Sequence, residues 1–128
     1  MTRRNTAPAR LKPIDRLRAI CLAFPKAVEQ ETWGDATFRV NAKIFAMHVV
    51  TDDRPSVWCK APPGSQLILV EADPERFFAP PYVGPKGWIG MHLDRRVRWD
   101  EVEEVVRRSY LLTAPKRLAA LIAGDRAG

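Results

Sequence analysis

No stretch of the 128-residue sequence is apolar over the roughly 20 residues that a membrane-spanning helix requires. The amino-terminal segment carries arginines but no apolar run behind them, which argues against a secretory signal. We therefore expect a cytoplasmic protein without membrane contact. We interpret residues 1–12 as a disordered basic arm, residues 13–123 as one domain with a single core, and residues 124–128 as a flexible tail.

Cysteine and histidine are scarce, with two residues of each. Cys21 and Cys59 stand inside apolar patterns without CxxC spacing, so we expect buried, reduced thiols, and burial should raise the pKa of Cys21. His48 and His92 have no carboxylate or cysteine at metal-ligand spacing, and we predict neither a metal site nor a cofactor. No serine has the surroundings of a nucleophile elbow. The chain thus offers no catalytic constellation, and we expect a protein that is not an enzyme.

The glycine-rich orders of nucleotide-binding loops are also absent. One segment instead combines aromatic residues, prolines and glycines around Lys86, and it reads RFFAPPYVGPKGWIG over residues 76–90. In one interpretation the prolines and glycines fix the backbone while the four aromatic side chains anchor the loop to the body. In the other, the stiff loop presents Lys86 and Tyr82 to a ligand. The two interpretations are compatible.

The apolar spacing and the turn residues predict an α+β fold, a two-layer domain in which helices cover an antiparallel sheet in the order α-β-β-β-α-β-α-α. Asn41 and Ala42 separate two strand-forming runs and indicate a tight hairpin. Strands are predicted at about 37–40, 43–50, 56–60 and 88–93. Helices are predicted at about 13–24, 65–72, 100–112 and from Pro115 onward.

Strand alternation predicts one apolar face on the sheet and an opposite face with cations and flat rings. The residues expected on that opposite face are Arg39, His48, Trp58, Lys60, Trp88 and His92, with Lys86 at its edge. Cations interleaved with aromatic rings suit phosphates and exposed bases, and the net charge of +6 favours an anionic partner. We predict DNA binding through Arg39, Trp58, Lys60, Lys86, Trp88 and His92.

Two alternatives stay open for this face. Trp58 and Trp88 could line a pocket for a small molecule or a surface for a protein partner, or the tryptophans could be covered while the cations only keep the face soluble. The oligomeric state is not determined by the sequence.

Three segments, 24–46, 73–94 and 99–118, together resemble the MmcQ/YjbR family. The most distinctive parts are the TFRV strand, the PPYVGPKGW loop and the SYLLTAPK junction. The resemblance implies a two-layer α+β domain similar to frataxin-like and secretion-chaperone-like folds, and it implies DNA binding through a double-wing arrangement. The basic composition departs from the acidic ridge of an iron-binding frataxin, so we expect no iron binding.

Overall fold

The computed structural model describes residues 12–94 and 97–127. These residues form four α-helices and six strands. The six strands build one antiparallel sheet of order β1-β2-β3-β4-β6-β5. The strands are β1 (Val28–Thr32), β2 (Asp35–Val40), β3 (Lys43–Thr51), β4 (Arg54–Cys59), β5 (Phe77–Phe78) and β6 (Ile89–His92). The helices are α1 (Pro13–Leu22), α2 (Ser65–Ala72), α3 (Trp99–Thr113) and α4 (Lys116–Ala127), with a 3₁₀ turn η3 (Gly84–Lys86) before β6.

The predicted α+β class and antiparallel sheet are confirmed, but two strands are missing from the prediction. β1 reads Val-Glu-Gln-Glu-Thr and has one apolar side chain, because it is an edge strand that buries little. β5 is too short to show alternation. Helix α4 extends to Ala127 and so includes most of the predicted tail, while the predicted basic arm lies outside the described residues except for Lys12. No helix in the described part of the chain is long and apolar enough to cross a membrane.

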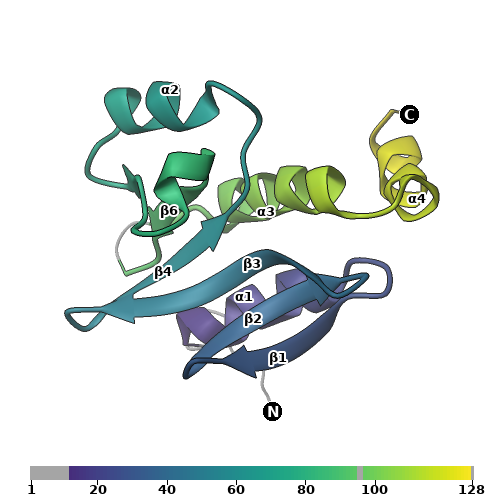
Figure 1. Cartoon of the computed structure of the whole chain (residues 1–128), viewed down its shortest axis with the longest axis horizontal. Helices are drawn as coiled ribbons and strands as arrows, with labels where there is room; N and C mark the ends of the chain where they lie inside the picture. Colours follow the sequence, from purple (N-terminus) through teal and green to yellow (C-terminus); the bar gives the residue numbers. More distant parts are fainter. Residues whose placement is uncertain (1–11, 95–96, 128) are drawn as a thin grey trace, which may run out of the picture.

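Helices α1 and α3 cover one face of the sheet, which is the far face in Figure 1. Phe38, Val57 and Met91 point from the strands into this layer, where they meet Leu17 of α1 and Val106 of α3. All five side chains are buried, so this interface is the main core. None of the described helices forms a layer over the other face, and we call it the outer face.

The ring of Tyr110 on α3 lies in the same core, stacked on Phe24 at 4.9 Å between ring centroids and edge-on to Phe45 at 5.3 Å. Its hydroxyl donates to the carbonyl of Pro25 at 2.8 Å. The side chain of Tyr110 thereby attaches the turn between α1 and β1 to α3. A buried ring of this kind has its polar end satisfied, as expected for tyrosine.

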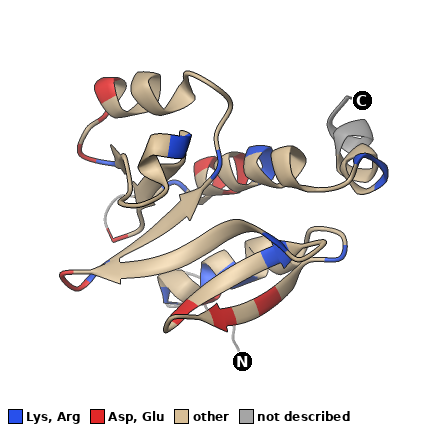
Figure 2. Cartoon of the chain, viewed as in Figure 1, with Lys and Arg blue, Asp and Glu red and all other residues tan. Residues whose placement is uncertain are grey.

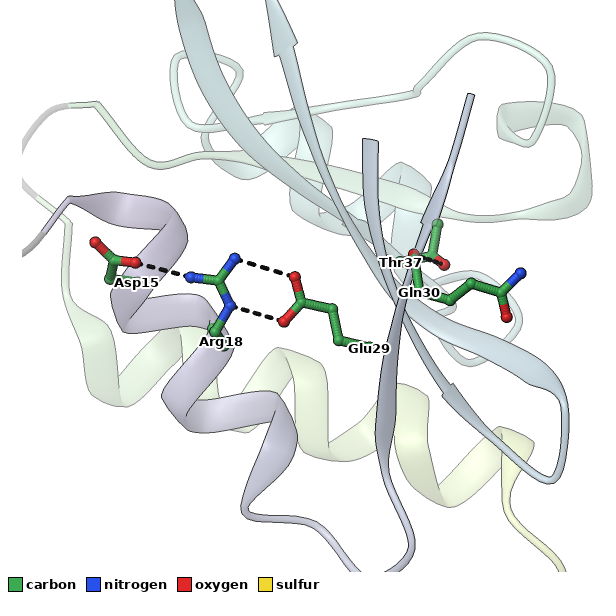
Figure 3. Close-up of polar contacts among 5 residues, drawn as sticks. All are labelled: Asp15, Arg18, Glu29, Gln30 and Thr37. Atoms are coloured by element: carbon green, nitrogen blue, oxygen red, sulfur yellow. Dashed lines mark hydrogen bonds and ion pairs between the residues drawn. The ribbon is translucent and has the colours of Figure 1, made fainter. Parts of the chain in front are cut away.

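An ion pair between Arg18 of α1 and Glu29 holds the edge strand β1 against the helix (Figure 3). The Nε and Nη2 of Arg18 donate to Glu29 at 2.7 and 3.0 Å, and its Nη1 donates to Asp15 at 2.8 Å. The hydrogen bond from Arg18 lowers the pKa of Glu29. On the opposite side of β1, the hydroxyl of Thr37 donates to the carbonyl of Gln30 at 2.6 Å. The negative charge of Glu29 is therefore turned toward the helix and away from the outer face.

A β-bulge at Phe45 interrupts the alternation of β3. Arg39 of β2 pairs with Ile44 and Phe38 pairs with Ala46, so Phe45 is an extra residue. Both Phe45 and Ala46 consequently lie in the main core. The hydroxyl of Ser109 on α3 donates to the carbonyl of Phe45 at 2.6 Å. This buried carbonyl belongs to the extra residue of the bulge, and Ser109 supplies it with a hydrogen-bond partner.

The bulge places His48 on the helix-covered face, so the prediction that it points outward was wrong. His48 pairs with Ala36 of β2 and Val57 of β4, and Val57 belongs to the main core. Its Nε2 is buried and has no hydrogen-bond partner among residues 12–94 and 97–127. Burial lowers the pKa of His48, with a smaller lowering from Arg18 and an opposing effect from Asp35.

We expect His48 to make the protein less stable in mild acid. Because its folded pKa lies below the ordinary value of 6.5, the unfolded chain binds the proton more readily. The contribution of neutral His48 is thus complete above pH 6.5 and is lost as the pH falls toward the folded pKa. Urea unfolding from pH 7 downward should show His48→Leu losing less stability than the original protein, and equal losses in both proteins would contradict this assignment.

Both cysteines are free and buried, as predicted. Burial raises the pKa of Cys59 to about 12 and raises that of Cys21 still further above its ordinary value. Neither thiol is ionised at neutral pH, so neither has the thiolate character of a nucleophile.

Candidate functional site

The outer face contains a hollow of about 1020 Å³, which we call the outer groove. Its apolar floor is formed by Ile44, Met47, Val49, Trp58, Val83 and Trp88. Val49, Trp58 and Trp88 are the buried members of a second hydrophobic cluster, separate from the main core. This cluster exists because alternate residues of β3 and β4 face away from the helices, where the loop before β6 packs against them.

Trp58 and Trp88 lie in the floor of the groove and do not project from it. Their side chains are 8% and 9% exposed. The indole nitrogen of Trp58 donates to the hydroxyl of Ser56 at 3.1 Å, and that hydroxyl donates to the carbonyl of Val49 at 2.9 Å. The two tryptophans therefore expose little ring surface. They form part of the packed apolar floor of the groove.

The proline- and glycine-rich loop forms one wall of the groove, and α2 holds it in place. The side-chain amide of Gln66 donates to the carbonyl of Gly84 at 2.8 Å and to that of Trp88 at 2.6 Å. These bonds fix the η3 turn that carries Lys86. The predicted anchoring by all four aromatic residues is wrong for Tyr82, which is 90% exposed, whereas Phe77 is buried.

Four cationic side chains line the groove: Arg39, Lys43, Lys60 and Lys86. Figure 2 shows positively charged positions near the end of β2, at the end of β4 and on η3, while acidic positions mark β1 and α3. Burial lowers the pKa of Lys60, and the charges of Lys43 and Lys86 lower it further. The charges of Lys43 and Lys86 are thus close enough to act on the ammonium group of Lys60.

The guanidinium of Arg39 is held by neutral acceptors. Nη2 donates to the hydroxyl of Thr32 at 3.0 Å, Nε donates to that of Thr37 at 3.3 Å, and Nη1 donates to the carbonyl of Ala42 at 3.3 Å. These bonds orient the group without neutralising it. Arg39 keeps its full charge at the groove.

None of the four groove cations forms an ion pair within the part of the chain that the structure describes. Arginines elsewhere behave differently, because each of Arg18, Arg54, Arg76, Arg98 and Arg108 lies within ion-pair distance of a carboxylate. Asp35 is the one carboxylate among the described residues that line the groove. The groove is therefore a region of excess positive charge.

His92, which was predicted with the other site residues, lies outside the groove. Its ring stacks on Phe78 at 4.7 Å between centroids, and it lines a different hollow of about 820 Å³ with Arg54, Asp73 and Asp94. The register pairs His92 with Ser56, on the face opposite to that of His48. Among the described residues, no group of three or more His, Cys, Asp or Glu is arranged to hold a metal ion.

The structure brings Arg39, Trp58, Lys60, Lys86 and Trp88 together at one groove and separates His92 from them. Several groove residues were missed in the sequence, among them Lys43 and Trp33. Trp33 could have been found from the Trp33-Gly34 pair, because a residue followed by glycine between two extended runs indicates a two-residue hairpin turn. Recognising β1 was the necessary first step.

Comparisons with known proteins agree with this architecture. A family model described as YjbR matches residues 22–112. The crystal structure of Deinococcus radiodurans protein DR2400, a DUF419-domain protein, is similar over 79% of this chain and 80% of that chain, with 25% sequence identity and a TM-score of 0.69. No curated protein matches the sequence.

Proposed function

The chain belongs to the YjbR family, and we propose that it binds DNA through the cations of the outer groove without catalysing a reaction. The observation that supports this most is the gathering of Arg39, Lys43, Lys60 and Lys86 around one hollow without an ion pair to any residue that the structure describes. Cations that are not neutralised inside the protein are available to an external anion. Phosphate groups along a nucleic acid strand meet several such cations at once.

The lowered pKa of Lys60 points the same way. Burial, followed by the charges of Lys43 and Lys86, makes it harder to keep Lys60 protonated in the free protein. A bound phosphate offsets part of that cost, because it attracts the ammonium group of Lys60. A basic groove of this kind is the usual electrostatic footprint of a nucleic-acid-binding protein.

A compact anion with an apolar body is a second candidate ligand. The floor of Met47, Val49, Trp58 and Trp88 favours it, since small-molecule sites are concave and mostly apolar with a few placed polar groups. Such a ligand would use the same cations. The two candidates can be told apart with oligonucleotides of different length. A groove built for a compact anion would bind short and long oligonucleotides with the same affinity, whereas a DNA-binding groove would bind the longer ones more tightly.

We expect labelled oligonucleotides to bind with an affinity that falls as NaCl is raised. In fluorescence anisotropy titrations, the double variant Lys60→Gln/Lys86→Gln should bind more weakly at every salt concentration. Removing two phosphate contacts should also make the slope of log affinity against log salt shallower by about 1.5, since each contact contributes about 0.7 to 0.9.

The matched control is Lys116→Gln/Arg117→Gln, which removes the same charge from exposed positions on α4. This control should bind like the original protein. Equal weakening by the two double variants would mean that only the net charge matters, and the groove would lose its role. An affinity that does not change between short and long oligonucleotides would favour the compact ligand.

A further inference from the structure

Two aromatic side chains on the outer groove are almost wholly exposed. Trp33 is 89% exposed and Tyr82 is 90% exposed, and both line the groove. Both also have left-handed backbone conformations, with φ of 54° at Trp33 and 67° at Tyr82. Bulky residues rarely adopt such angles, because the Cβ atom crowds the backbone. Neither burial nor backbone preference accounts for aromatic residues at these two positions.

The other hairpins of the same sheet show which residues the turn itself favours. Three two-residue turns connect β1 to β2, β2 to β3 and β3 to β4. The first position of each turn has the same backbone angle, with φ of 54° at Trp33, 53° at Asn41 and 53° at Asp52. Asparagine and aspartate tolerate this conformation, whereas tryptophan is strained in it. Strained residues that persist without a structural reason indicate a functional position.

The two rings stand at separate margins of the groove. Trp33 lies in the turn between β1 and β2, and Tyr82 lies in the loop between β5 and η3. The loop that carries Tyr82 folds back over the sheet, where Val83 packs against Trp58 and Trp88. The two rings thus come from separate segments, so each can stack on its own base of an extended strand.

We propose that the outer groove binds an unpaired DNA strand, with Trp33 and Tyr82 each stacking on one exposed base while Lys60 and Lys86 contact phosphates. This inference rests on the proposed DNA binding and specifies the form of DNA. Bases in a duplex are stacked on one another and do not offer their faces to protein rings. Free aromatic rings beside excess positive charge are the features with which proteins bind single strands, without a need for a particular sequence.

The test compares one oligonucleotide as a single strand and as a duplex, by anisotropy at a fixed salt concentration. The single strand should bind at least about tenfold more tightly. Trp33→Asn and Tyr82→Asn suit the left-handed backbone and should fold as well as the original protein, yet each should weaken single-strand binding about tenfold, as loss of base stacking does. Trp33→Phe keeps a ring and should recover part of the affinity.

A control and a spectroscopic signal make the test specific. Leu67→Gln removes an exposed apolar side chain from α2, outside the groove, and should bind like the original protein. Trp33 is the most exposed of the tryptophans, so its stacking should quench intrinsic fluorescence, and this quenching should disappear in Trp33→Asn.

The outcomes separate this inference from the function on which it rests. If Lys60→Gln/Lys86→Gln weakens binding while Trp33→Asn and Tyr82→Asn bind the single strand normally, DNA binding stands and base stacking is overturned. Tighter binding of the duplex than of the single strand also overturns the inference. Failure of both forms to bind the original protein overturns the DNA-binding function itself, and the inference with it.

Discussion

Ser109→Ala is expected to lower the free energy of unfolding by about 3 kcal/mol, because it removes the partner of one buried and one partly buried backbone group. The Ser109 hydroxyl donates to the carbonyl of Phe45 at 2.6 Å and accepts from the backbone N–H of Lys60 at 2.8 Å. Ser109 is fully buried, so water cannot replace it. The change should appear in urea unfolding as a lower midpoint with an unaltered slope.

Thr113→Val is the matched control, since it removes a hydroxyl from the same helix without exposing an unsatisfied group. The hydroxyl of Thr113 donates at 2.8 Å to the carbonyl of Ser109, which also belongs to the hydrogen-bond ladder of α3. The loss should be about 1 kcal/mol or less. Equal destabilisation by the two variants would contradict the bridging role of Ser109.

The bridge also links the covered face of the sheet to the groove. Phe45 is the extra residue of the bulge, and Lys60 directly follows β4 and lines the groove. One side chain on α3 therefore ties the interruption of β3 to the position of a groove lysine. A helix on the covered face is thus connected to one residue of the outer groove.

The helices and the hairpins were predictable where local patterns are strong. The turn at Asn41 and Ala42 was recognised from its neighbouring strands, and both residues have the positive φ that such a turn requires. The outward direction of Trp58 and Trp88 also followed from alternation. Their burial did not follow, because it depends on the loop before β6 folding back over the sheet, with Val83 packed against the two rings.

The direction of His48 could not be predicted because the run from Ile44 to Val50 is almost entirely apolar. In such a strand no alternation reveals which residue is extra, and a shift of one residue turns every following side chain to the other face. Trp33 escaped notice for a related reason. The strand before it, β1, is polar, so no apolar pattern marked the hairpin in which Trp33 is the exposed turn residue.

Gly90→Ala is expected to lower the free energy of unfolding by about 2 kcal/mol, because the ring of Phe78 lies directly over the Gly90 backbone. A Cβ atom at this position would lie 2.3 to 2.7 Å from three ring carbons of Phe78. The ring has no easy escape, since it stacks on His92 and packs against the cluster of Trp58 and Trp88. A glycine inside a strand often marks such a close approach. Thermal or urea unfolding measures the loss.

Gly84→Ala is the control for Gly90→Ala, because it adds the same methyl group at a position with room for it. A Cβ atom there would meet Ala79 at 3.5 Å or more, which is ordinary contact, so the stability should change little. Replacing Phe78 by leucine in the Gly90→Ala protein should recover part of the loss, because the smaller side chain leaves room for the methyl group. The two substitutions must then be non-additive, as residues in direct contact are. Strict additivity would mean that the methyl group acts on the backbone of β6 and not on the ring that supports the groove floor.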